Sequence, residues 1–124
     1  MTDNTEVVNE AYAAFGRGDI PAVLALLADD IEWEGTDALP QSGSFRGPDG
    51  VGEFFAGVGS NWDDLSISID EMIVDGDHVV AVGHGEGTLA GGADASYGFT
   101  HVFRLADGKV VNFAEYAAPG PGLV

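Results

Sequence analysis

The stretch YAAFGRGDIPAVLALLADDIEWE, residues 12–34, contains the signals that decide how this chain folds. Gly16 and Gly18 follow an aromatic helical pattern and are predicted to end it, since glycine accepts the left-handed conformation of a helix C-terminus. Asp19 then has the position of a helix N-cap, with a proline in the first turn that follows. The stretch therefore predicts a helix that ends near residue 15, a second helix over 20–28 and a strand over 31–34.

The next segment is predicted to be a loop followed by a third helix. Residues 35–44 contain turn-forming residues, and Phe45 and Arg46 form a short extended piece. Pro48 suits a first helical turn, and the glycines at 57 and 59 are predicted to end the helix. Its apolar residues recur at helical spacing on one face: Val51, Phe54, Phe55 and Val58.

From Trp62 onward the apolar period changes to two, which indicates β-strands. Asp75-Gly76 and Asp107-Gly108 are hairpin signals, and Gly91-Gly92 marks a turn between them. The strands are predicted to run from 62 to the first turn and over 79–89, 96–105 and 110–117. The tail, 119–124, contains alternating proline and glycine and is predicted to be a loose or partner-bound end.

This order of elements predicts one α+β domain over residues 1–118. Each helix has one apolar stripe to bury, so we expect a cone-shaped roll in which the three N-terminal helices pack on a strongly curved antiparallel sheet. The glycines within the predicted strands fit bends or close packing in such a sheet: Gly83, Gly85, Gly87 and Gly98.

Three groups of residues carry a resemblance to a known family. They are Leu-Leu-Ala-Asp-Asp and Ile-Glu-Trp within 26–33, Phe-Arg-Gly-Pro at 45–48 before a helix with two phenylalanines, and His-Val-Phe-Arg-Leu at 101–105 before Asp-Gly-Lys. In this order they resemble the SnoaL-like branch of the nuclear transport factor two-like superfamily, over nearly the whole chain. The resemblance implies a cystatin-like or ketosteroid isomerase-like cone, but one scaffold of this kind hosts many functions.

The resemblance also bears on the reaction. His101 takes the place of the second, protonated aspartate in the oxyanion hole of ketosteroid isomerases, whereas their proton-shuttling aspartate and helix tyrosine correspond to Gly35 and Ala11. Limonene epoxide hydrolases use an arginine and two aspartates. Here the only arginine on the late strands is Arg104, which is predicted to point outward, so the resemblance does not imply their reaction. The SnoaL-type polyketide cyclases use a late-strand aspartate as acid and base, and His101 could stand in for it.

The composition limits the partners of this chain. Its 124 residues contain 21 acidic and four basic residues, with a net charge of −17, so nucleic acid and anionic membranes are poor partners. Cysteine is absent, which excludes disulfides and thiolate chemistry. Neither a membrane-spanning run nor a signal peptide is visible, and we expect a cytoplasmic location. The acidic surface indicates either solubility alone or adaptation to high salt.

The last hairpin is predicted to place a histidine and a glutamate on one inward face. A three-residue loop with a left-handed Gly108 pairs Phe103 with Val111 and makes His101 and Glu115 diagonal neighbours. A two-residue loop would instead place Phe103 opposite Asn112, and the apolar pattern favours the first register. The two ionisable side chains would then lie among aromatic rings.

His101 and Glu115 are therefore the candidate catalytic residues, with a neutral imidazole as base and the carboxylate orienting it. The alternative is a buried polar pair that only satisfies its own hydrogen bonds. Aromatic side chains are the candidate ligand-binding residues, and simple core packing is the alternative for each: Tyr12, Phe15, Trp33, Phe54, Phe55, Trp62, Tyr97, Phe99, Phe103 and Phe113. His84 and Glu86 alternate on one strand and offer too few ligands to predict a metal site.

Two functions are compatible with these features. The first is a cofactor-independent isomerase, cyclase or dehydratase that acts on a hydrophobic cyclic compound by acid–base catalysis. The second is a non-catalytic module that binds a small hydrophobic ligand or associates through its sheet. In both cases we expect a homodimer through the sheet, since its convex face needs cover.

Overall fold

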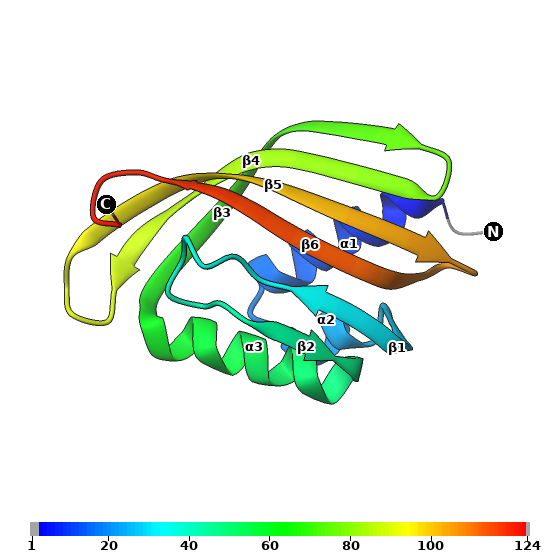
Figure 1. Cartoon of the computed structure of the whole chain (residues 1–124), viewed down its shortest axis with the longest axis horizontal. Helices are drawn as coiled ribbons and strands as arrows, with labels where there is room; N and C mark the ends of the chain where they lie inside the picture. Colours follow the sequence, from blue (N-terminus) through cyan, green and yellow to red (C-terminus); the bar gives the residue numbers. More distant parts are fainter. Residues whose placement is uncertain (1–2, 124) are drawn as a thin grey trace.

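The computed structural model describes residues 3–123 and shows three helices on the concave side of one curved sheet (Figure 1). The elements, in chain order, are α1 (Asn4–Gly16), α2 (Ile20–Leu24), β1 (Leu27–Glu34), β2 (Ser44–Arg46), α3 (Gly47–Asn61), β3 (Trp62–Asp75), β4 (His78–Leu89), β5 (Asp94–Ala106) and β6 (Lys109–Pro119). The sheet order is β2-β1-β6-β5-β4-β3. The predicted α+β cone is confirmed.

Most of the predicted capping and turn residues of the N-terminal helices have their predicted roles. Asp3 caps α1 by accepting a hydrogen bond from the Thr5 amide, and Asp19 caps α2 through the Ala22 amide. Gly18, with a φ of 72°, carries the chain between these two helices. The apolar stripe of α3 is buried at Val51, Phe54 and Val58.

Two predicted helix ends are wrong. Helix α2 stops at Leu24 instead of continuing to residue 28, because Leu27 already pairs with Val110 of β6 and tertiary pairing overrides the helical pattern. Helix α3 continues past its two glycines to Asn61, whose side-chain amide donates to the Gly57 carbonyl. Buried Trp62 then begins β3.

One strand pair differs from the predicted antiparallel sheet. Strand β1 lies parallel to β6, with Trp33 opposite Phe113, while β1–β2 and the pairs from β3 to β6 are antiparallel. The parallel pair joins the N-terminal half of the chain to its last strand. It brings the stacked rings of Trp33 and Phe113 together, with centroids 3.8 Å apart.

The register predicted for the last hairpin is also wrong. Asp107 and Gly108 both have positive φ, 54° and 78°, as a two-residue type I′ turn requires. Leu105 pairs with Val110, and a bulge follows, so that Phe103 lies opposite Phe113 and His101 lies directly opposite Glu115. The bulge restores the inward direction of the later side chains, which is why a two-residue turn is compatible with the apolar pattern.

The tail is not loose over residues 119–123. Strand β6 extends to Pro119, the Gly120 amide donates to the Ser96 carbonyl, and the Ser96 amide donates to the Pro121 carbonyl. Leu123 packs against the core. The backbone of the tail is thus hydrogen-bonded to the start of β5. Of the predicted tail, only Val124 lies outside the described residues.

Two strand glycines make room for aromatic rings on the inner face. A Cβ atom at Gly85 would lie 2.6 Å from Tyr97 Cζ, and one at Gly83 would lie 2.9 Å from Phe99 Cζ. Neither approach is possible for a larger residue, so these rings lie flat on β4. This packing fixes the positions of both rings on the concave face of the sheet.

Candidate functional site

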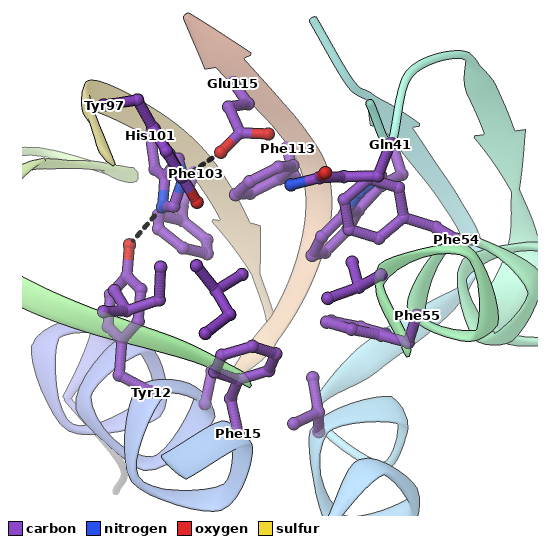
Figure 2. Close-up of a pocket in the computed structure, with 16 residues that line it drawn as sticks. Tyr12, Phe15, Gln41, Phe54, Phe55, Tyr97, His101, Phe103, Phe113 and Glu115 are labelled. Carbon is purple, nitrogen blue, oxygen red and sulfur yellow. Dashed lines mark hydrogen bonds and ion pairs between the residues drawn. The ribbon is translucent and has the colours of Figure 1, made fainter. Parts of the chain in front are cut away.

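A small apolar cavity of about 80 Å³ lies between the helices and the concave face of the sheet. A single water needs roughly 10–15 Å³ on this scale, so the cavity has room for one small ring. All predicted site residues line it except Trp62 and Phe99: they are Tyr12, Phe15, Trp33, Phe54, Phe55, Tyr97, His101, Phe103, Phe113 and Glu115. Figure 2 shows ten of the lining side chains with labels.

Trp62 and Phe99 lie behind the cavity wall. The Trp62 indole Nε1 donates a 2.9 Å hydrogen bond to Gln41 Oε1, and Gln41 itself lines the cavity. Phe99 stacks on the His101 ring, with centroids 3.9 Å apart. Both residues support lining residues instead of facing the cavity.

Tyr12, His101 and Glu115 form a chain of hydrogen bonds along one side of the cavity (Figure 2). His101 Nε2 lies 2.8 Å from Glu115 Oε2, and Tyr12 Oη lies 2.7 Å from His101 Nδ1. A carboxylate only accepts, so Nε2 carries the hydrogen, and Nδ1 of the neutral ring accepts from the tyrosine hydroxyl. Both nitrogens of His101 are therefore bonded within the protein.

The hydrogen-bonded series Tyr12–His101–Glu115 lies in a buried, apolar environment. Burial, and secondarily the negative charge of Glu115, raise the pKa of Tyr12 and that of Tyr97 far above the ordinary tyrosine value. Both phenols are consequently protonated at any physiological pH and available as donors. Tyr12 uses its hydrogen on His101, whereas the Tyr97 hydroxyl has no hydrogen-bond partner within residues 3–123.

Two buried polar atoms have no partner among the described residues: Glu115 Oε1 and Trp33 Nε1. One is an acceptor and the other a donor, and both residues line the cavity. An unpaired buried polar atom is costly, typically about 1–3 kcal/mol. A bound molecule with matching groups could satisfy either atom.

Sequence reasoning missed several lining residues. Gln41 comes from the loop before β2, and Leu65 and Ile67 come from the inner face of β3. The alternation of β3 contained a signal for the last two. The sequence around Gln41 contained no such signal, because the placement of this side chain depends on its hydrogen bond with the distant Trp62.

The other histidines lie away from the cavity. His84 is exposed on the outer face of the sheet, where its Nδ1 is 3.1 Å from Asp70 Oδ2, and Glu86 is exposed on the same strand face. His78 pairs with Asp77 at a turn. Among residues 3–123, no group of three side chains has the arrangement of a metal site, and no helix there is long and apolar enough to cross a membrane.

Comparison with known proteins identifies relatives of the same fold. An NTF2-like protein of unknown function from Burkholderia pseudomallei is 33% identical, with a TM-score of 0.88, covering 95% of this chain and 92% of that one. An NTF2-like protein from Burkholderia thailandensis is 31% identical, with a TM-score of 0.89 and the same coverage. TerC, co-crystallised with polyporic acid, is 29% identical, with a TM-score of 0.85, covering 93% and 91%.

The search of curated proteins gives no match. The family described as the SnoaL-like domain matches residues 8–113, which run from within α1 to the middle of β6. The chain therefore belongs to the SnoaL-like domain family.

Proposed function

We propose that the cavity binds a small cyclic ketone or enol and that Glu115 Oε1 exchanges a proton with it. The observation that supports this proposal is the burial of Oε1, without a donor among the described residues, in a wall of aromatic side chains. A carboxylate held in apolar surroundings by one oxygen, with the other unpaired, is suited to act as a base.

In this proposal, His101 positions the base. From the sequence, the imidazole was predicted to take the proton and Glu115 to orient it. Because Tyr12 and Glu115 already bond both ring nitrogens, neither nitrogen can meet a ligand without breaking a short hydrogen bond. The Nε2–H group holds Oε2 and thereby directs Oε1, and Tyr12 fixes the tautomer that makes this possible.

The proposed step is a proton transfer that needs no further reactant. The C–H bond next to the ketone breaks, and its proton forms an O–H bond with Glu115 Oε1. Its electron pair forms the C=C bond of an enolate as the π pair of the C=O bond moves onto the ketone oxygen. The Tyr97 hydroxyl lines the same cavity and is a candidate donor to that oxygen. Return of the proton to carbon or oxygen gives an isomer or an enol and restores the carboxylate.

Deuterium exchange tests this proposal. Cyclohexanone in D₂O should gain deuterium next to its carbonyl faster with the protein, and proton NMR measures the rate. Glu115→Gln should lower the accelerated rate by about 10²–10⁴-fold, the usual worth of a positioned acid or base. The matched control, Glu86→Gln, removes the same charge from the exposed outer face and should leave the rate unchanged.

A non-catalytic ligand-binding module is the second candidate, and the almost wholly apolar lining favours it equally. The same experiment separates the two. Binding of cyclohexanone without any exchange, in parent and variant alike, would assign the cavity to binding alone.

We also propose that two copies associate through the outer face of the sheet. Adjacent positions Ile73, Val80, Val102 and Ala114 form an apolar row across β3 to β6, and Tyr116 is exposed beside it. Sedimentation should show a dimer at micromolar concentration that Val80→Glu dissociates. A monomer in both low and high salt would contradict this proposal.

A further inference from the structure

We infer that the ligand of this cavity is a neutral ring compound with a phenol or enol hydroxyl. Its O–H donates to Glu115 Oε1, and its oxygen accepts from the Tyr97 hydroxyl. This inference rests on the proposed function, because it names the chemical class of ligand for the same cavity. The inference adds that the cavity selects its ligand by hydrogen bonding and charge, which apolar walls alone cannot do.

The acceptor half of the site is Glu115. Its side chain is only 5% exposed, and Oε2 already accepts from His101 Nε2 at 2.8 Å. No described residue donates to Oε1. A hydroxyl of the ligand can supply that hydrogen, and a hydrogen bond to an ionised oxygen is about twice as strong as a neutral one.

The donor half is Tyr97. Its ring is buried on Gly85, and its hydroxyl has no partner within residues 3–123. Figure 2 shows Tyr97, His101 and Glu115 toward one end of the cavity, with Phe15 and Phe55 toward the other. We place the ligand hydroxyl at this polar end, where it would donate to the carboxylate and accept from the Tyr97 phenol, with its ring among the apolar side chains.

Charge and size exclude other ligand classes. An anionic carboxylate would place a second negative charge beside Glu115 in apolar surroundings, which is strongly unfavourable. A plain hydrocarbon would fit the walls but leave Oε1 unpaired. The cavity of about 80 Å³ admits one ring of this kind.

Three ring compounds of similar size test the inference by isothermal titration calorimetry: phenol, toluene and benzoate. The parent protein should bind phenol at least about 10-fold more tightly than toluene, since a hydrogen bond to a charged group is worth roughly that or more. Benzoate should bind at least about 10-fold more weakly than toluene.

Variants assign the two contacts. Glu115→Gln should reduce the preference for phenol over toluene to about threefold or less and improve benzoate binding. Tyr97→Phe should weaken phenol binding about 3- to 10-fold without changing toluene binding. Retained toluene affinity shows that each variant still folds with its cavity, and the outer-face control Glu86→Gln should bind all three compounds as the parent does.

The outcomes distinguish this inference from the proposed function. Equal affinities for phenol and toluene, or a preference for benzoate, would overturn the hydroxyl inference while leaving an apolar ring pocket in place. Failure of all three compounds to bind would overturn both. An unchanged preference for phenol over toluene in Glu115→Gln would show that another group accepts the hydrogen bond from the ligand hydroxyl, and would overturn the assignment to Glu115.

Discussion

Two histidine–carboxylate pairs lie on opposite faces of the same sheet. His101 and Glu115 face the helices, with side chains 9% and 5% exposed, and a nitrogen–oxygen distance of 2.8 Å. His84 and Asp70 face outward at 48% and 58% exposure, with a distance of 3.1 Å. Each pair joins an imidazole to a carboxylate, but only the inner pair is surrounded by aromatic rings and held by a third group, Tyr12.

The comparison shows that a histidine–carboxylate pair alone does not create a candidate reactive site. Burial of the inner pair does. Water satisfies the remaining atoms of the outer pair and weakens its attraction. The inner pair must satisfy its atoms from the protein or from a ligand, and one oxygen of Glu115 has no partner among the described residues.

Removing the carboxylate should affect stability very differently on the two faces. Glu115→Ala leaves His101 Nε2–H buried without an acceptor and should lower the free energy of unfolding by about 3 kcal/mol. Asp70→Ala should lower it by less than about 1 kcal/mol, because both partners are solvated. Urea denaturation measures both values, and similar losses would remove the contrast.

Tyrosine hydroxyls should show the same contrast with a smaller effect. Tyr12→Phe removes the donor to buried His101 Nδ1 and should lower the free energy of unfolding by roughly 1–2 kcal/mol. Tyr116, 62% exposed on the outer face, is the matched control, and Tyr116→Phe should change stability by less than about 0.5 kcal/mol. Nitrogen-15 NMR of His101 should show the Nε2–H tautomer in the parent. An Nδ1–H tautomer would contradict the assigned chain.

High pH should destabilise the inner face. Burial raises the folded-state pKa of Tyr12 and Tyr97 above the ordinary value of 10.0, so the folded protein keeps protons that the unfolded chain loses. Stability from these groups is complete below pH 10 and falls above it, by up to about 1.4 kcal/mol per pH unit for each tyrosine. Urea midpoints between pH 9 and 11 measure the slope. A Tyr12→Phe, Tyr97→Phe double variant with an unchanged slope would contradict this assignment.

Salt should act on the charged surface and give the smallest effect. The net charge of −17 makes the surface carboxylates repel one another, and added chloride salt screens that repulsion. We expect a gain of about 1 kcal/mol, or roughly 4 °C in Tm, between low and molar salt. Thermal melting across a salt series measures this gain, and a flat or falling curve would remove the argument for adaptation to high salt.

The sequence predicted the inner face well because local patterns determine it. Alternation along β5 directed Tyr97, His101 and Phe103 inward, and the helical spacing of α3 directed Phe54 toward them. Each of these inferences needed only the period of a strand or a helix. The structure finds all of these side chains around the cavity.

The pairing of strands was less predictable because it depends on distant contacts. The bulge at Val111 has no signal in the sequence, yet together with the two-residue turn it changes the partner of His101 from the predicted Phe113 to Glu115. The parallel pairing of β1 with β6, and the Trp62 bond that places Gln41, join segments far apart in the chain. The proposed exchange of roles between His101 and Glu115 rests on contacts of this kind, since only the structure shows that both imidazole nitrogens are bonded.

A crystal structure with phenol bound tests the central proposal most directly. We predict the phenol oxygen within about 2.6 Å of Glu115 Oε1, with Oε2 still on His101 Nε2 and the ring among Phe54, Phe55 and Phe113. Phenol bonded to a nitrogen of His101, with Glu115 or Tyr12 displaced, would contradict the account and return the role of base to the histidine.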